Sequence, residues 1–221
     1  MKRFLRENSL GLTAFLLFAV FLFGQSVTGH REYNADQAQH HEAEVSYARY
    51  LRTGAFFEAT FENWESEFLQ MGAYVLLTAW LLQKGSPESR PIKGSPPQDE
   101  DPETKVGRPD APWPVRRGGV ALAIYRHSLS IAFLALFFGS WLGHAAGGSR
   151  EYSAEQRAHG RPAVSMATYM RTSRFWFESF QNWQSEFLAV GSIVVLSIFL
   201  REQRSPESKP VAAPHRETAT T

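Results

Sequence analysis

The chain has 221 residues, a length that allows one or two domains. Its 23 Lys and Arg against 22 Asp and Glu leave a formal net charge of +1, which gives no support to nucleic-acid binding, because that function usually shows a concentrated basic excess. Cysteine is absent, which excludes a disulfide framework, a thiolate metal site and a cysteine nucleophile.

The first apolar stretch follows the basic residues Lys2, Arg3 and Arg6 and predicts a transmembrane helix over residues 8–27. That length is about the 20 residues that cross the hydrocarbon of a bilayer. A basic start before an apolar run is also typical of a secretory signal. The same segment recurs internally at residues 127–146, where a signal peptidase would not act on an export signal, so we favour two membrane-spanning helices.

The polar stretch after the first span predicts a short helix that begins at Ser46, a good N-cap residue, and runs to Arg52. A second helix begins near Ala55. It carries aromatic residues at spacings of 4, 3 and 4, which places them on one helix face. Aromatic residues of this kind commonly anchor a helix at the membrane interface; they are Phe57, Phe61, Trp64 and Phe68, and in a second copy Trp176, Phe180, Trp183 and Phe187.

Two shorter apolar stretches predict the second span at residues 64–82 and the fourth at residues 183–200. Both begin close to a carboxylate, Glu67 or Glu186, which we therefore expect at the edge of the hydrocarbon. Between the second and third spans, residues 93–123 are rich in Pro, Gly and charge and cannot bury enough apolar surface to fold alone. We expect a flexible linker there and a disordered tail over residues 212–221.

An internal repeat organises the chain. Residues 5–92 align with 124–211 without a gap, and 35 of the 88 aligned pairs are identical. This indicates a duplication, with repeat 1 at residues 1–92 and repeat 2 at residues 124–211. Each repeat holds two spans, an even number, so both should enter and leave on the same side and be related by a pseudo-twofold axis along the membrane normal. We expect an all-α integral membrane protein of four transmembrane helices, as two parallel two-span repeats.

Lysine and arginine placement predicts the orientation. The N-terminus, the linker and the C-terminal tail hold 15 of the 23 basic residues, and the two loops at residues 28–63 and 147–182 hold the other 8. Because cytoplasmic segments carry the excess of Lys and Arg, we expect both termini in the cytoplasm and the short loop helices on the extracytoplasmic face.

Polar positions that are identical in both repeats are the candidates for a functional site. Those that we weigh are Arg31 and Arg150, Arg52 and Arg171, Asn63 and Asn182, Trp64 and Trp183, Glu67 and Glu186, and the histidines His40 and His159. Ionisable groups near the membrane interior are costly, so they are usually paired or functional.

Two interpretations of Glu67 and Glu186 stay open. In the first, each forms an ion pair with a loop arginine, Arg31 or Arg52 in repeat 1 and its counterpart in repeat 2, and fastens the loop to the membrane. In the second, the two carboxylates face one another across the pseudo-twofold axis and bind a proton or a cation, with Asn63 and Asn182 as neutral oxygen ligands. We favour the first, because both carboxylates lie near the boundary of the membrane and not in mid-span.

Metal binding and enzymatic activity receive little support. The histidines that invite a zinc or copper site are His30, His40, His41, His144 and His159, but the adjacent pair lacks the spacing that places two ligands on one helix face, and only His40 and His159 are equivalent in the repeats. No Gly-rich phosphate loop, Gly-x-Ser-x-Gly turn or His-Glu-x-x-His motif occurs. We expect no cofactor and no enzymatic activity.

Several motifs together resemble an uncharacterised family of small bacterial membrane proteins, classed as a domain of unknown function. These are Arg-Glu-Tyr after the first span, Tyr-Leu-Arg-Thr before the aromatic helix, Ser-Pro-Glu-Ser after the second span and, most specifically, the repeated Asn-Trp-x-Ser-Glu-Phe-Leu block. The resemblance implies a location in the bacterial cytoplasmic (inner) membrane.

Two functions follow as expectations. The first is a non-enzymatic structural or accessory membrane protein, and the second is a small proton- or cation-coupled transporter or channel that uses Glu67 and Glu186. The expected partners are the lipid bilayer and, beyond it, further copies of the chain or other membrane proteins.

Overall fold

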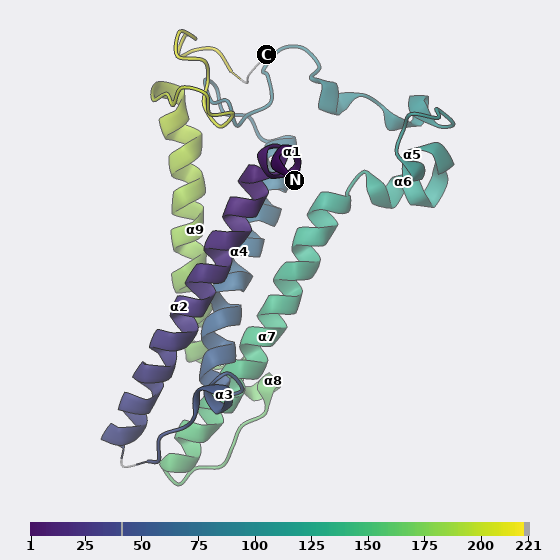
Figure 1. The fold of residues 1–221 in the computed structure, drawn as a ribbon. Coiled ribbons are helices and arrows are strands. Elements are labelled where there is room, and N and C mark those ends of the chain that lie inside the picture. The colour runs from purple at the N-terminus through teal and green to yellow at the C-terminus, as the bar shows by residue number, and fades with distance from the viewer. Residues whose placement is uncertain (41, 219–221) are drawn as a thin grey trace. The chain divides into compact units, whose positions relative to one another are not determined.

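The computed structural model describes residues 1–40 and 42–218. Within these residues every regular element is helical, which confirms the all-α prediction (Figure 1). The elements are α1 (Lys2–Glu7), α2 (Ser9–Gln39), α3 (Tyr47–Tyr50), α4 (Gly54–Trp80), the 3₁₀ turns η1 (Pro97–Asp99) and η2 (Pro102–Lys105), α5 (Trp113–Arg117), α6 (Gly119–Tyr125), α7 (Ser128–Ala158), α8 (Met166–Tyr169) and α9 (Ser173–Phe199).

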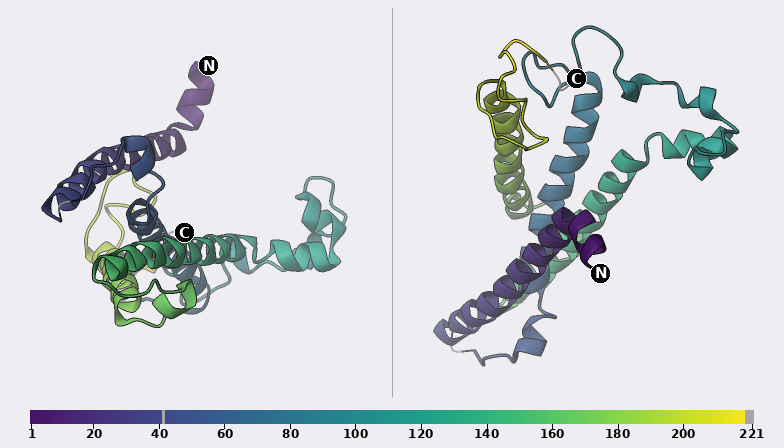
Figure 2. Two further views of the ribbon diagram at one scale, coloured as in Figure 1. Left: turned by 90° about the horizontal axis from the view of Figure 1, so that it is seen from below. Right: turned by 45° about the horizontal axis from the view of Figure 1, so that its top comes forward.

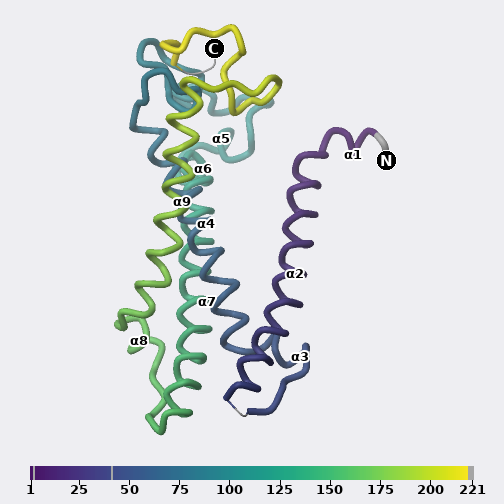
Figure 3. The backbone as a smooth tube through the Cα atoms, turned by 90° about the vertical axis from the view of Figure 1, so that its left-hand side faces the viewer, coloured from purple at the N-terminus to yellow at the C-terminus, as the bar shows by residue number. Residues whose placement is uncertain are grey.

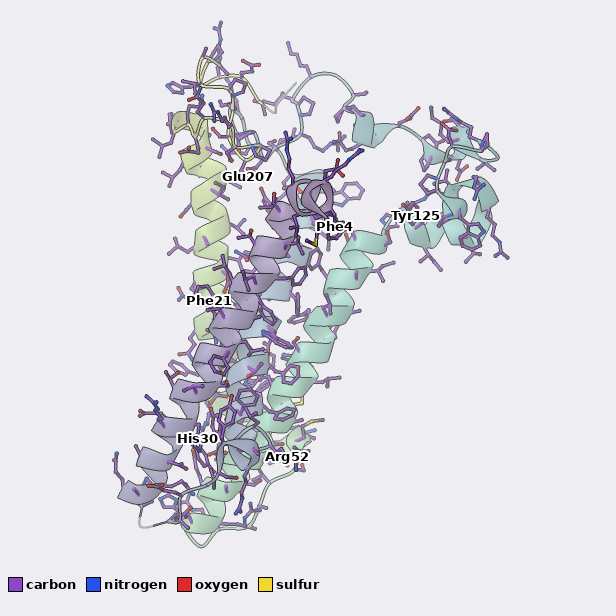
Figure 4. The ribbon with its side chains drawn as sticks, in the orientation of Figure 1. Phe4, Phe21, His30, Arg52, Tyr125 and Glu207 are labelled. Carbon is purple, nitrogen blue, oxygen red and sulfur yellow. The ribbon has the colours of Figure 1, made fainter. Side chains whose placement is uncertain are left out.

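Three helices in the described part of the chain, α2, α7 and α9, are long and apolar enough to cross a membrane. On α2 the apolar side chains lie at the surface, with Leu10 85% and Phe21 69% exposed (Figure 4). Such a surface suits a helix surrounded by lipid. Helix α4 is not among the three, because carboxylates and Gln70 interrupt its apolar residues, so the arrangement of four spans in two repeats stays a prediction.

The two longest helices extend beyond the predicted spans. Helix α2 continues to Gln39 and α7 to Ala158, although the spans were expected to end at residues 27 and 146. The residues after each span contain no proline, so the backbone hydrogen bonds of the helix continue into the polar sequence. The first part of each predicted loop is therefore helical.

The first loop helix begins where the sequence predicts, after Ser46, but it ends at Tyr50 and not at Arg52. Ser46 and Ser165 occupy the N-cap positions of α3 and α8, and the hydroxyl of Ser165 accepts a hydrogen bond from the amide of Thr168. Both helices are short, four residues each, because Thr53 and Thr172 fold back and donate to the carbonyls of Tyr50 and Tyr169.

The chain forms two compact units, and each takes segments from both halves of the sequence. The first unit comprises Met1–Phe61 and Leu142–Phe175, and the second comprises Glu62–Trp141 and Trp176–Thr221. Helices α4, α7 and α9 each contribute residues to both units.

In the first unit two tyrosines pack on glycines. An added Cβ at Gly29 would lie 2.2 Å from the hydroxyl of Tyr50, and one at Gly148 would lie 2.3 Å from the hydroxyl of Tyr169. In each case the glycine lies on the long helix and the tyrosine on the short loop helix that follows it. The absence of a side chain at these glycines therefore lets each loop pack closely on its own helix.

The second unit holds the predicted linker and the C-terminal tail. The linker contains η1, η2, α5 and α6, the last of which ends at Tyr125 (Figure 4). The tail follows α9 and lies beside the segment after α4 (Figure 2). The ammonium of Lys209, almost fully buried, makes this contact by donating to the carbonyls of Gly85, His215 and Glu217.

Candidate functional site

The repeated block meets its own second copy in the second unit, where α4 and α9 run alongside one another (Figure 3). Helical spacing places Glu62, Ser66 and Gln70 at every fourth position on one face of α4, with Glu65 beside them. On α9 the same spacing aligns Asn182 with Glu186. We call the interactions between these two faces the α4–α9 polar contact.

Carboxylates of α4 accept hydrogen bonds from side chains of α9. The side-chain amide of Asn182 donates to Oε1 of Glu62, and that of Gln181 donates to the same oxygen at 3.3 Å. The indole nitrogen of Trp183 donates to Oε1 of Glu65 at 2.9 Å. Glu65 is 0% exposed. A buried carboxylate is tolerated when hydrogen bonds satisfy it, so these bonds hold the polar face of α4 against α9.

Side chains of α4 also donate hydrogen bonds to α9. The hydroxyl of Ser66 donates to Oε1 of Glu186 at 3.3 Å, and the side-chain amide of Gln70 donates to the backbone carbonyl of Glu186 at 3.0 Å. Ser66 is buried and Glu186 is half-buried. Glu186, the candidate carboxylate of repeat 2, is thus a hydrogen-bond acceptor within the α4–α9 polar contact.

The predicted residues divide between the contact and its surroundings. Asn182, Trp183 and Glu186 take part in the contact, whereas Asn63 and Glu67, their counterparts on α4, are exposed and Trp64 is half-buried. The pairing of Glu67 with Glu186 across an axis stays a prediction.

Aromatic residues of α9 form a continuous row, as their spacing predicts. The ring centroids of Trp176 and Phe180 are 5.4 Å apart, and those of Phe180 and Trp183 are 5.5 Å apart. The ring of Phe137 on α7 meets Trp183 at 6.1 Å. Trp183 therefore combines an apolar ring packed on its neighbours with a polar nitrogen aimed at Glu65.

The four predicted loop arginines, Arg31, Arg52, Arg150 and Arg171, are exposed and lie in the first unit (Figure 4 labels Arg52). Their ion pairs with Glu67 and Glu186 stay a prediction. Another arginine in this unit, Arg174, forms an ion pair with Glu155 at 2.6 Å and lies over the ring of Tyr152.

The histidines separate into exposed and buried ones. His40 is exposed and lies 3.6 Å from Asp36, and the exposed His159 contacts the backbone carbonyl of Glu155. His30 lies on α2 within 2.7 Å of the carbonyl of Val45 (Figure 4). His41 lies outside the described residues. His144 is 0% exposed.

His144 belongs to a buried polar cluster of the first unit that sequence reasoning missed. Its other members are Glu58, 8% exposed, and Tyr169, whose hydroxyl donates to Oε1 of Glu58 at 3.0 Å. A carboxylate oxygen of Glu58 lies within 4.8 Å of a ring nitrogen of His144. Carboxylates and imidazoles both bind protons, and both are ligand types for zinc.

Close helix packing creates this cluster. An added Cβ at Gly147 on α7 would lie 2.5 Å from the backbone nitrogen of Glu58 on α4, and one at Gly143 would lie 2.6 Å from the ring of Phe61. Glycines at these positions let the two backbones approach and enclose the side chains beside them. Comparison of the repeats could not single out this cluster, because Glu58 aligns with Phe177 and His144 with Gln25.

Each loop of the first unit is held to its long helix by a pair of hydrogen bonds at equivalent positions, although the side chain that makes them differs between the repeats. Asn34 exchanges two hydrogen bonds with the backbone of Val45, at 2.9 and 3.0 Å. The hydroxyl of Ser153 does the same with the backbone of Val164, at 3.0 and 3.1 Å. Residues 119 positions apart thus have the same structural role.

Comparison with known proteins gives one family. The family described as a domain of unknown function, DUF6766, matches residues 1–220. No curated protein and no solved structure matches the chain.

Proposed function

Because the chain belongs to the DUF6766 family, whose description assigns no activity, we propose its function from its own residues: a multi-pass bacterial membrane protein with a structural or accessory role and no enzymatic activity. The observation that carries this proposal is the α4–α9 polar contact. There, Glu65 and Glu186 accept hydrogen bonds from the neighbouring helix. A measured interhelical hydrogen bond in a membrane protein contributes about 0.6 kcal/mol on average, so several of them stabilise a helix pair usefully.

The same contact supports α4 as a fourth span. Its carboxylates make it less apolar than α2, α7 and α9, but Glu62 and Glu65 face donors on α9 and are satisfied within the protein. Polar groups that are bonded in this way are compatible with a helix inside the bilayer. We infer four spans in two parallel repeats, with the lipid bilayer as the first partner and both termini in the cytoplasm.

Recurring contacts support the repeat architecture. Tyr50 on Gly29 and Tyr169 on Gly148 are equivalent, as are the loop braces of Val45 and Val164. The sequence of each repeat thus builds the same helix and loop. In this proposal the loops form an extracytoplasmic surface that other copies or other membrane proteins can contact.

The test removes the side chain of Glu186, which accepts a hydrogen bond from Ser66 of α4. In Glu186→Ala the bond from Ser66 to α9 is lost and its hydroxyl keeps only the carbonyl of Asn63 in its own helix, so we expect a lower thermal midpoint of the protein in detergent. Proton flux through liposomes that hold the variant should equal that of liposomes that hold the wild type. The combined variant E67Q/E186Q should behave in the same way. Unchanged stability together with altered flux would overturn the structural role.

A proton- or cation-coupled transporter is the second candidate, and the buried cluster of Glu58, His144 and Tyr169 favours it. In this alternative Glu67 and Glu186 form one carboxylate site and the buried cluster offers a second group that can take up protons. Glu58→Gln and His144→Gln should then abolish a pH-gradient-driven flux that the wild type shows. A wild type without flux above empty liposomes would exclude this candidate.

A further inference from the structure

Residues 62 and 181 are equivalent positions of the two repeats, and they contact one another. The side-chain amide of Gln181 donates to Oε1 of Glu62 at 3.3 Å. When two related helices pack about a twofold axis, equivalent residues meet only at that axis. In the two parallel repeats proposed above, the 62–181 contact therefore lies on the axis that runs along the α4–α9 pair.

The two residues at this point differ in a way that matters for pairing. Repeat 1 has the carboxylate of Glu62 where repeat 2 has the amide of Gln181, and likewise Glu65 where repeat 2 has Gln184. If α4 packed in the same way on α4 of a second copy, Glu62 would face Glu62. Two carboxylates that meet at one contact repel one another. Gln181 is exposed and Glu62 is half-buried, so solvent screens part of this repulsion.

The mixed pair has the better hydrogen bonds. Glu62 accepts from both Asn182 and Gln181, and Glu65 accepts from Trp183. Hydrogen bonds to a charged acceptor are shorter and stronger than those between neutral groups. A pair of two α9 helices would place amide against amide at residue 181 and would lack this charge assistance. At residues 62 and 65 of α4 the carboxylates are thus the acceptors and α9 supplies the donors, whereas further along the pair Ser66 and Gln70 of α4 donate to Glu186.

We propose that the difference between Glu62 and Gln181 determines the pairing partner of the repeated block: α4 pairs with α9 of the same chain and not with α4 of a second copy. The assignment goes beyond a structural role, because it says which helix the block recognises. Contacts between copies must then use other surfaces than this face of α4.

The experiment is a charge-exchange series in the full chain, reconstituted in lipid nanodiscs or detergent. Gln181→Glu places two carboxylates at the axis, and we expect a lower thermal midpoint. The double variant E62Q/Q181E restores one carboxylate and one amide in exchanged positions and should recover most of the loss. The matched control is Gln184→Glu, the same change at an equally exposed position of α9. The side chain of Gln184 donates to the carbonyl of Gln181 in its own helix and not to α4, so this variant should have little effect.

A second measurement follows association between copies. Two differently tagged copies are co-expressed, and one is captured in detergent to measure how much of the other it retains. Glu62→Gln removes the like-charge contact between two α4 helices, so we expect up to about fivefold more retained partner, equivalent to about 1 kcal/mol.

Two results would overturn the proposal. The first is a double variant no more stable than Gln181→Glu alone, since that would show that the two positions do not act on one another. The second is capture that is the same for the wild type and for Glu62→Gln. Neither result depends on proton flux through liposomes, so failure of this proposal can be distinguished from failure of the proposed function.

Discussion

Glu65 on α4 is fully buried, and the indole nitrogen of Trp183 on α9 donates to its carboxylate from 2.9 Å. The two residues are 118 positions apart in the sequence. Because an unsatisfied buried carboxylate is costly, this bond commits the two helices to one register. Trp183 is therefore more than an interfacial anchor.

Removal of the donor should test this directly. Trp183→Phe keeps an aromatic ring but leaves Glu65 without the indole donor, and we expect a loss of about 1–3 kcal/mol in the free energy of unfolding. Trp80→Phe makes the same change at an exposed position near the end of α4 and should cost little. Chemical unfolding in mixed micelles measures both, and equal losses would contradict the role of the bond.

The buried cluster of the first unit allows a matched pair of tyrosine variants. Tyr169→Phe removes the hydroxyl that donates to Glu58, and we expect a loss of about 1–3 kcal/mol because the carboxylate stays buried. Tyr50→Phe is the same change at the equivalent position of repeat 1. The residue of repeat 2 that is equivalent to Glu58 is Phe177, which has no carboxylate to accept a hydrogen bond. A smaller loss is expected there, and the thermal midpoints of the two variants give the comparison.

Two glycines of α7 should respond oppositely to alanine. At Gly147 an added Cβ would lie 2.5 Å from the backbone nitrogen of Glu58, so the helices must separate, and we expect a loss of about 1–3 kcal/mol. At Gly139 nothing lies within 4 Å, and alanine should stabilise the helix by up to about 1 kcal/mol. Opposite shifts of the thermal midpoint would confirm the close helix approach, and a neutral Gly147→Ala would contradict it.

The sequence predicts much of the fold but only part of the candidate site. Helical periodicity and apolar length identify the long helices, and Ser46 marks the start of the first loop helix. Identity between the repeats finds Trp183 and Glu186 but passes over Glu62 and Glu65, because in a pair of helices the useful partners of a donor are acceptors, not identical residues. Pairing across 118 to 120 positions depends on packing, which no local pattern contains.

The last prediction concerns the pH dependence that arises from Glu88, which lies after the second predicted span. Tyr74 donates a hydrogen bond to the half-buried carboxylate of Glu88 in the Ser-Pro-Glu-Ser loop after α4. Burial raises the pKa of Glu88 above its ordinary value, the bond from Tyr74 opposes this shift, and nearby Glu207 adds to it. The folded state therefore holds this proton more tightly than the unfolded state does.

The sign of the pH effect follows from this difference in proton affinity. The contribution of Glu88 to stability is complete below its unfolded pKa of 4.5 and is lost as pH rises through its higher folded pKa. Thermal midpoints measured upward from about pH 4 should fall less in Glu88→Gln than in the wild type, because the amide does not titrate. Glu207→Gln should move the wild-type fall to lower pH, since it removes a neighbouring negative charge. A Glu88→Gln profile parallel to the wild type would assign the pH dependence to other groups.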